Sequence, residues 1–368
     1  MNKLEKRAGF VLVMLLVAGC VGCSGNTSGE KRGNGKETVK EDIKAGVKAE
    51  EKKNVKEVKE TIVLQLAYEN NPGEPFDLAA NRWAELLGEA SQGTMRIDLF
   101  PSGQLGTQDE MIDQIIAGEN IITLADPGFY ADRGVKDFGI MFGPYMFDTW
   151  EDVWKVTESN WFIGECEKLE KHGIKTIASN WMYGDRHTLS VKPIQTVEDL
   201  KGMKIRVPNT EIQIAGFSAL GAVPTPMSLS EVYTSLQQKV IDGLENPLST
   251  LYNGRFQEVA KYLILDGHVK DFSTLICNVD IYSGLNQDQQ QWLTQTCVEA
   301  GIYNNEISSN MEDEYTKQFE DEGVQIVVPD QDVMEGFKEK AKAFYEDPQV
   351  TKDWSDGLYQ TIQDILAQ

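Results

Sequence analysis

From residue 61 onward, two kinds of hydrophobic pattern alternate along the chain. Short runs in which apolar side chains alternate with polar ones, or follow one another without a break, predict β-strands. They fall at residues 62–67, 95–100, 121–124, 175–179 and 204–207. Longer segments with apolar positions every three to four residues predict helices at residues 77–90, 107–117, 210–220, the stretch that follows Ser228 to Glu231, and 286–322. Strands that alternate with helices predict an α/β fold.

The helical period also predicts which side of two helices is buried. In residues 77–90 the predicted apolar side holds Leu78, Trp83, Leu86 and Leu87. In residues 286–322 it holds Trp292, Leu293, Val298 and Ile302. The second helix would be about 50 Å long at about 1.5 Å per residue, which exceeds one small lobe. We therefore expect it to span two lobes. Two helix starts, Thr107 to Glu110 and Ser228 to Glu231, have the spacing of a capping box.

The first 60 residues form a separate region. Basic side chains in residues 1–7 precede an apolar run at residues 8–18, which is too short to cross a bilayer and is typical of a signal peptide. A short buried helix is the alternative. The run ends in Val17-Ala18-Gly19-Cys20, which resembles the lipobox of bacterial lipoproteins. We therefore predict a signal peptide at residues 1–19 and lipidation of Cys20, which fits this pattern better than Cys23.

Residues 20–60 are predicted to be the lipidated cysteine followed by a disordered, charged tether. Residues 24–60 contain Gly, Ser, Asn, Lys and Glu with isolated Val and Ile and no aromatic residue, so they cannot bury enough surface to offset their ordering entropy. As a flexible coil they would reach about 30–35 Å. Val39, Ile43 and Val47 recur every four residues, so a helix is the alternative.

The charge of the chain limits its partners. The 368 residues contain 35 Lys and Arg against 58 Asp and Glu, for a formal net charge of -23. The first 60 residues are net basic by about four charges, so residues 61–368 carry about -27. Such an acidic surface argues against nucleic acid as a partner and favours a small ligand. We expect a monomer.

Motifs for metal binding and catalysis are missing from the sequence. The three histidines stand at no ligand spacing, and Cys166, Cys277 and Cys297 form no CxxC pair. We interpret these cysteines as buried thiols, with one disulfide as the alternative. The chain has no GxSxG, HExxH, GxGxxG or phosphate-loop motif, although many active sites have no local motif. We therefore expect no metal, no cofactor and no enzymatic activity.

Two arginines are the strongest candidates for binding. Arg186 follows Trp181 and Tyr183 closely in the chain, and Arg206 lies at the end of the strand predicted at 204–207. In an acidic protein the simple interpretation of either arginine is a surface ion pair. The alternative is a carboxylate ligand, because a guanidinium offers two parallel hydrogen bonds and stays protonated when desolvated.

Many blocks of sequence around these arginines resemble the DctP family, the solute-binding proteins of TRAP transporters. The blocks are Pro101–Gly106, Pro144–Phe147, Pro193–Ile194, Asp199–Gly202, Lys204–Pro208, Leu220–Ala222, Pro224–Met227, Ser230–Tyr233, Leu236–Gln238 and Asp242–Pro247. They follow the order of the family, and the resemblance covers essentially all of residues 61–368. It therefore rests on many motifs together.

The resemblance implies a two-lobed α/β fold of the periplasmic-binding-protein type, with the ligand in a cleft that closes by a hinge motion. Lobe I is expected to comprise residues 61–183, completed by about 272–311. Lobe II is expected to comprise residues 184–271, completed by about 312–368. The protein would lie outside the cytoplasmic membrane, held at its outer face by the lipid anchor, and deliver an organic acid to integral membrane subunits of a TRAP transporter. An extracellular enzyme or a ligand sensor acting on acidic sugars is the alternative.

The resemblance also implies roles for individual residues. Arg206 would pair with the ligand carboxylate, and Arg186 and Asn246 would line the cleft. Asp126 follows a strand and would accept a hydrogen bond from a ligand hydroxyl or ammonium group, with a turn before Pro127 as the alternative. Asn209 is either a ligand contact or the cap of the next helix.

Aromatic residues are weaker candidates. Tyr68, Trp181 and Tyr183 are candidates for the pocket wall, with core packing as the alternative for each. Leu229 occupies a position that is often aromatic in the family, which puts a stacking contact in doubt. Family members take C4-dicarboxylates, sialic acid, uronates and other sugar acids, keto acids and some amino acids. The two arginines with Asp126 and His187 favour a hydroxylated monocarboxylate such as a uronate over a plain dicarboxylate.

Overall fold

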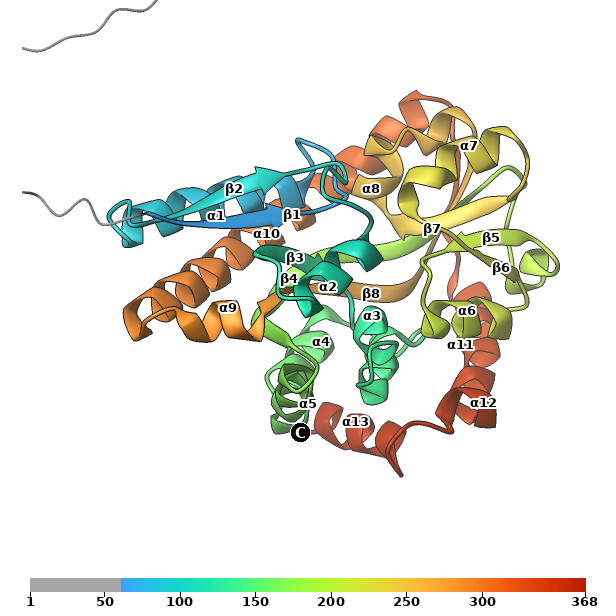
Figure 1. Cartoon of the computed structure of the whole chain (residues 1–368). Coiled ribbons are helices and arrows are strands. Elements are labelled where there is room, and N and C mark those ends of the chain that lie inside the picture. Colours follow the sequence, from blue (N-terminus) through green and yellow to red (C-terminus); the bar gives the residue numbers. More distant parts are fainter. Residues whose placement is uncertain (1–60) are drawn as a thin grey trace, which may run out of the picture. The chain divides into compact units, whose positions relative to one another are not determined.

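A mixed β-sheet of nine strands runs through the computed structural model, which describes residues 61–368 (Figure 1). The strands lie in the order β2-β1-β3-β8-β4-β7-β5-β6, and β9 pairs with β8. They are β1 (Ile62–Ala67), β2 (Met95–Phe100), β3 (Ile121–Ala125), β4 (Ile174–Ser190), β5 (Lys204–Val207), β6 (Val223–Pro226), β7 (Gly243–Pro247), β8 (Tyr262–Asn278) and β9 (Gln325–Val327). The predicted signal peptide, Cys20 and the tether lie outside these residues. In the described part, no helix has the length and apolar character needed to cross a membrane.

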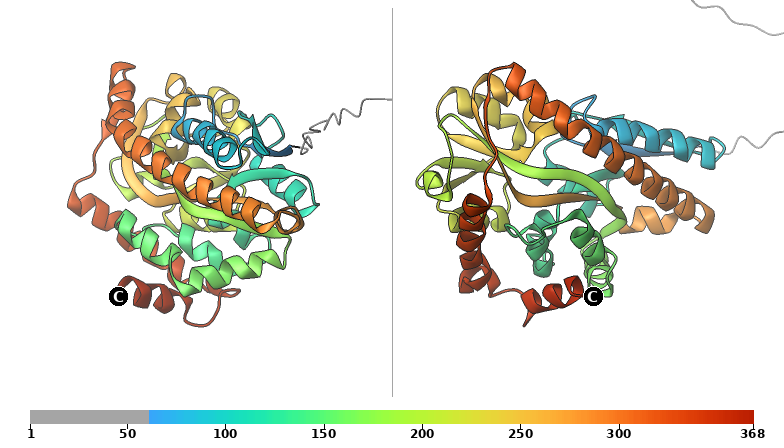
Figure 2. Two further views of the ribbon diagram at one scale, coloured as in Figure 1. Left: turned by 90° about the vertical axis from the view of Figure 1, so that its left-hand side faces the viewer. Right: turned by 180° about the vertical axis from the view of Figure 1, so that it is seen from behind.

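Helices cover both faces of this sheet (Figures 1 and 2). The α-helices are α1 (Pro75–Ala90), α2 (Gln108–Ile116), α3 (Pro127–Ala131), α4 (Trp150–Thr157), α5 (Asn160–Glu170), α6 (Glu211–Ala219), α7 (Val232–Gln237), α8 (Leu248–Asn253), α9 (Val279–Gly284), α10 (Gln287–Asp321), α11 (Gln331–Glu346), α12 (Pro348–Thr351) and α13 (Leu358–Leu366). Short 3-10 turns are η1 (Lys136–Phe142), η2 (Val197–Leu200), η3 (Leu229–Glu231) and η4 (Phe256–Glu258). At the start of α2, Thr107 and Glu110 form the predicted capping box.

Strands β4 and β8 join the two lobes. Each has 17 residues, and they pair antiparallel along most of their length, so both pass through the middle of the sheet. On one side β3 pairs with β8, and on the other β7 pairs with β4. The pairing shifts between Met182 and Gly184, where Gly184 has a φ of 133° and approaches Pro247 closely. The fold is thus the two-lobed α/β fold that was expected.

The prediction of a short strand at residues 175–179 captured only the first part of β4, and β8 was not predicted. Strand β8 contains Asp266, His268, Lys270 and Asp271 among its apolar residues, and all but Lys270 are buried. Charged side chains inside a strand interrupt the apolar pattern, so the hydrophobic pattern alone does not predict this strand.

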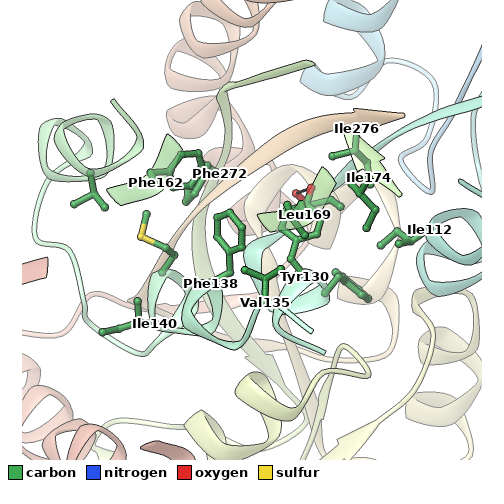
Figure 3. Close-up of a cluster of buried hydrophobic side chains, with 14 of the residues drawn as sticks. Ile112, Tyr130, Val135, Phe138, Ile140, Phe162, Leu169, Ile174, Phe272 and Ile276 are labelled. Atoms are coloured by element: carbon green, nitrogen blue, oxygen red, sulfur yellow. Dashed lines mark hydrogen bonds between the residues drawn. The ribbon is translucent and has the colours of Figure 1, made fainter. Parts of the chain in front are cut away.

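Separate hydrophobic clusters stabilise the parts of the two lobes. Figure 3 shows one of them, in which Phe162 and Phe272 lie side by side with their ring centroids 5.9 Å apart. Phe138 meets Phe162 edge to face at 5.3 Å. Each fully buried side chain of this kind contributes about 1.5–3 kcal/mol relative to an exposed one. These clusters fix the ends of the strands from which the site is built.

Helix α10 spans both lobes, and Figure 2 shows it as one long helix that runs beside α1. Near its start Leu293 and Cys297 pack with Trp83 of α1, whereas Tyr315 and Phe319 near its end pack with Leu251 of α8. The predicted buried side was partly wrong. Val298 and Ile302 are 38% and 62% exposed.

The rotation of α10 has a steric cause. Gly301 lies against β4 so closely that a Cβ atom there would be 2.8 Å from a ring atom of Trp181. Small and polar residues therefore face the strand, among them Ala300 and Asn304. In α1, Leu78 is likewise 38% exposed, although the other three predicted residues are buried.

The division of the chain into two lobes remains a prediction. The packing of the C-terminal helix does not agree with that division. Leu358 and Ile362 of α13 pack in the cluster that contains Val153 of α4 and Phe162 of α5. The last helix therefore packs on the side assigned to lobe I, although residues 312–368 were assigned to lobe II. Within residues 61–368 the three cysteines are free.

Candidate ligand-binding site

A cavity of about 50 Å³ lies between the two predicted lobes, and we call it the inner chamber. Its lining from the lobe I side is Glu69, Asn70, Gln108, Leu124, Asp126, Phe129 and Tyr183. From the lobe II side it is Arg186, Arg206, Pro208, Leu229 and Asn246. The three residues that the resemblance places in the cleft, Arg206, Arg186 and Asn246, therefore line one chamber, together with the weaker candidate Asp126.

Arg206 is a buried cation with no acidic partner in residues 61–368. It lies on β5, where Ile205 and Val207 point into the core and Arg206 points the other way, as strand alternation requires. Its side chain is 4% exposed, and Nε and Nη2 both donate to the carbonyl oxygen of Met227, at 2.9 and 2.8 Å. Among the described residues no carboxylate lies within ion-pair distance of it. Burial lowers the pKa of Arg206 to about 10, so it stays protonated at neutral pH.

Arg186 is also buried, but unlike Arg206 it pairs with two carboxylates. On β4 it donates through Nε to Glu245 at 2.5 Å and through Nη1 to Asp271 at 2.6 Å. Its Nη2 donates to Glu245 Oε1 at 2.8 Å. Burial opposes its charge, but the two carboxylates outweigh burial and raise the pKa of Arg186. Burial also opposes the ionised form of Glu245, yet Arg186 and His268 lower the pKa of Glu245 to about 2.

Two carboxyl groups beside the chamber have raised pKa values. Burial raises the pKa of Asp126 to about 6, even though Arg186 counteracts it. Burial raises the pKa of Glu69 to about 7, against the attraction of Arg206. A buried oxygen of Asp126 has no hydrogen-bond partner in the described part of the chain. Glu69 can therefore donate as well as accept a hydrogen bond near neutral pH, and Asp126 can do so below about pH 6.

Asn246 and the remaining predicted residues occupy different places. Asn246 of β7 is buried at the chamber wall, and its amide makes no hydrogen bond to the residues that the structure describes. Trp181 is fully buried in the core and donates from Nε1 to the carbonyl oxygen of Cys297 at 3.1 Å. Tyr68 is also fully buried and donates to Asp77 at 2.7 Å. Asn209 is exposed, and Thr210 caps α6 instead.

Several lining residues were not predicted from the sequence. Glu69 and Asn70 follow β1 after Tyr68, and Gln108 opens α2, where its Nε2 donates to the carbonyl oxygen of Leu124 at 2.5 Å. Residues that follow a strand at the end of a sheet are common ligand contacts, which is the signal that could have found Glu69. Tyr183, the third aromatic candidate, does line the chamber. Within residues 61–368 no group of three or more potential ligands is placed to hold a metal ion.

Two lobes joined by crossing strands, with a cavity between them that charged and amide side chains line, are the architecture expected of a solute-binding protein. The chain belongs to the bacterial extracellular solute-binding protein family 7, or DctP family, whose profile matches residues 66–352.

Individual relatives agree with this assignment. A TRAP periplasmic solute-binding protein of Ochrobacterium anthropi, solved with bound L-fuconate, is 39% identical, with a TM-score of 0.79 over 83% of this chain and 99% of that chain. A second, from Actinobacillus succinogenes 130z with bound L-galactonate, is 37% identical, with a TM-score of 0.78 over the same shares. The sialic acid-binding periplasmic protein SiaP of Vibrio cholerae is 30% identical over 84% of this chain and 94% of its own length.

Proposed function

We propose that the protein captures a monocarboxylic sugar acid of the aldonate class, with its carboxylate in the inner chamber, and delivers it to the membrane subunits of a TRAP-type transporter. The observation that carries this proposal is the state of Arg206. A guanidinium taken out of water without a counterion is costly, and a bound carboxylate would offset that cost with two charge-assisted hydrogen bonds. Arg206 is therefore the residue that we assign to the ligand carboxylate.

The rest of the lining favours one carboxylate and several hydroxyl groups. Arg186 is already paired with Glu245 and Asp271, so it has little capacity left for a second ligand charge. Asn246, Asn70 and Gln108 bear amides, while Asp126 and Glu69 would repel a second carboxylate when ionised. An amide or carboxyl group pairs well with a hydroxyl group. A dicarboxylate would place its far end among these acidic side chains, so the chamber suits a sugar acid better.

Several relatives point in the same direction. The two TRAP proteins that are 39% and 37% identical hold L-fuconate and L-galactonate, both six-carbon aldonates. More distant relatives bind sialic acid and 2,3-diketo-L-gulonate. We further propose that the protein acts as a monomer outside the cytoplasmic membrane, that Cys20 carries its lipid anchor, and that it has no enzymatic activity.

Thermal-shift screening followed by calorimetry tests the proposal. The panel would contain L-fuconate, L-galactonate, D-galactonate and D-gluconate, with succinate and malate as dicarboxylates and galactitol as the neutral control. We expect at least one aldonate to bind in the micromolar range, and galactitol and the dicarboxylates to bind at least 100-fold more weakly. Absence of binding by every aldonate, or tighter binding by a dicarboxylate, would overturn the proposal.

A further inference from the structure

A second cavity, of about 230 Å³, adjoins the inner chamber, and we call it the outer chamber. Glu69 and Leu229 line both cavities, so the two meet at these side chains. The rest of the outer lining is Asn71, Ser102, Gly103, Ser230, Tyr233, Thr250, Gly254 and Phe256. It is drawn from both predicted lobes, as is the lining of the inner chamber.

From this arrangement we infer that the two chambers form one site for a glycosylated sugar acid. The acid end would lie against Arg206 in the inner chamber, and a neutral sugar attached to it would fill the outer chamber. The inference rests on the proposed function, and it extends the ligand class from single aldonates to aldonates that carry a second sugar unit.

The sizes of the two chambers support this division. A cavity needs about 10–15 Å³ to hold one water molecule. At about 50 Å³ the inner chamber has room for a few such volumes, whereas the outer chamber is more than four times larger. A ligand that reaches Arg206 and is longer than a short acid must therefore extend past Glu69 and Leu229. The outer chamber is the space that receives this extension.

The lining of the outer chamber indicates a neutral, hydroxylated group. Hydroxyl and amide side chains come from Asn71, Ser102, Ser230 and Thr250, and among its described lining residues none is basic. Glu69 is its one acidic group, so a second carboxylate would meet a like charge and no cation. Aromatic rings beside a few polar groups are typical of small-molecule pockets, and Tyr233 and Phe256 supply them here. A sugar unit matches this combination of hydroxyl groups and apolar CH faces.

Leu229 controls the connection between the chambers. It belongs to η3, and its side chain is one of the two shared walls. A larger side chain at this position would narrow the passage, but it would also disturb the inner chamber. Ser230 is the better position for a test, because it is exposed and lines only the outer chamber.

Calorimetry with paired ligands tests the inference on the full chain. Each aldonate that binds would be compared with its 4-O- and 6-O-galactosyl derivatives, which for gluconate are lactobionate and melibionate. We expect at least one derivative to bind within about tenfold of its parent aldonate. If an aldonate binds and both derivatives are more than tenfold weaker, the inference is wrong while the proposed function stands. If no aldonate binds, the proposed function fails and the inference fails with it.

A matched pair of substitutions locates the second sugar. Ser230→Trp fills part of the outer chamber and should weaken the binding of the glycosylated acid at least tenfold more than it weakens the binding of the parent aldonate. Thr234→Trp adds the same bulk at an exposed position of α7 that lines neither chamber and should change neither affinity. Unchanged binding of the glycosylated acid to Ser230→Trp would show that the second sugar does not occupy the outer chamber. That result would overturn the inference.

Discussion

Replacing Arg206 by methionine should abolish ligand binding and leave the fold intact. In the complex, the substitution would leave the ligand carboxylate buried without a cation, at a cost of about 3–5 kcal/mol. Since about 1.4 kcal/mol corresponds to a factor of ten, the affinity should fall by two to nearly four orders of magnitude. Arg206→Lys should also bind poorly, because an ammonium group cannot form two parallel hydrogen bonds with a carboxylate.

Arg206→Met should change the free energy of unfolding of the ligand-free protein only slightly, because two contributions oppose each other. The substitution removes the two hydrogen bonds to the carbonyl oxygen of Met227. It also removes a buried charge that has no acidic partner among the described residues, and methionine fills most of the same volume. We therefore expect the free energy of unfolding to change by no more than about 2 kcal/mol.

Arg186→Met is the matched control, because it removes a paired cation. The substitution would leave Glu245 and Asp271 buried without their shared guanidinium. Breaking a buried pair in this way costs about 3–5 kcal/mol of stability, which corresponds to a fall in Tm of roughly 5–15 °C. Calorimetry with the best aldonate and a thermal melt would be run on both variants. Aldonate affinity of Arg206→Met within threefold of wild type, or a loss of Tm as large as that of Arg186→Met, would refute the assignment of Arg206.

Three further predictions concern acidity, closure and anchoring. Burial raises the pKa of Asp126 to about 6, above an unfolded value of about 3.9, so its contribution to stability is present below pH 4 and is lost as pH rises through 6. Asp126→Asn should therefore reduce the fall in Tm between pH 5 and 7.5, and an unchanged slope would contradict the raised pKa. Small-angle scattering should give a smaller radius of gyration with saturating aldonate than without it, because the ligand contacts both lobes only when they are closed. An identical curve with binding confirmed would mean that the ligand-free form is already closed. Cys20→Ser should abolish partitioning into the detergent phase in the native host, and partitioning equal to wild type would point to Cys23.

The sequence predicted best those elements whose signal is local. Strands β1, β2 and β5 have the predicted bounds, and α2 begins with the predicted capping box. The side of α10 that is buried could not be predicted, because Gly301 packs against β4 through a contact far away in the chain. Hydrophobicity alone favoured the larger residues Val298 and Ile302, whereas close packing selected small ones.

The residues of the candidate site were predicted from sequence motifs and not from the pattern of hydrophobic positions. Arg206, Arg186 and Asn246 came from blocks of family resemblance, and the structure places all three in the inner chamber. The aromatic candidates show the limit of this reasoning. Tyr68 and Trp181 lie close in the chain to chamber residues, but both are fully buried in the core, where Phe76 packs against both rings with its centroid 5.1 Å from each.

The hardest part to predict, β8, is also the part that holds the site together. His268 on this strand donates or accepts at both ring nitrogens, contacting Asp266 at 3.2 Å and Glu245 at 3.1 Å. Burial opposes the charged ring, but these carboxylates raise the pKa of His268 to about 9. Asp271 on the same strand pairs with Arg186. These buried charged side chains interrupt the apolar pattern of the strand because they pair with one another instead of packing in the hydrophobic core. A gap in the hydrophobic pattern between two well-predicted elements is therefore itself a sign of where the polar site of this fold lies.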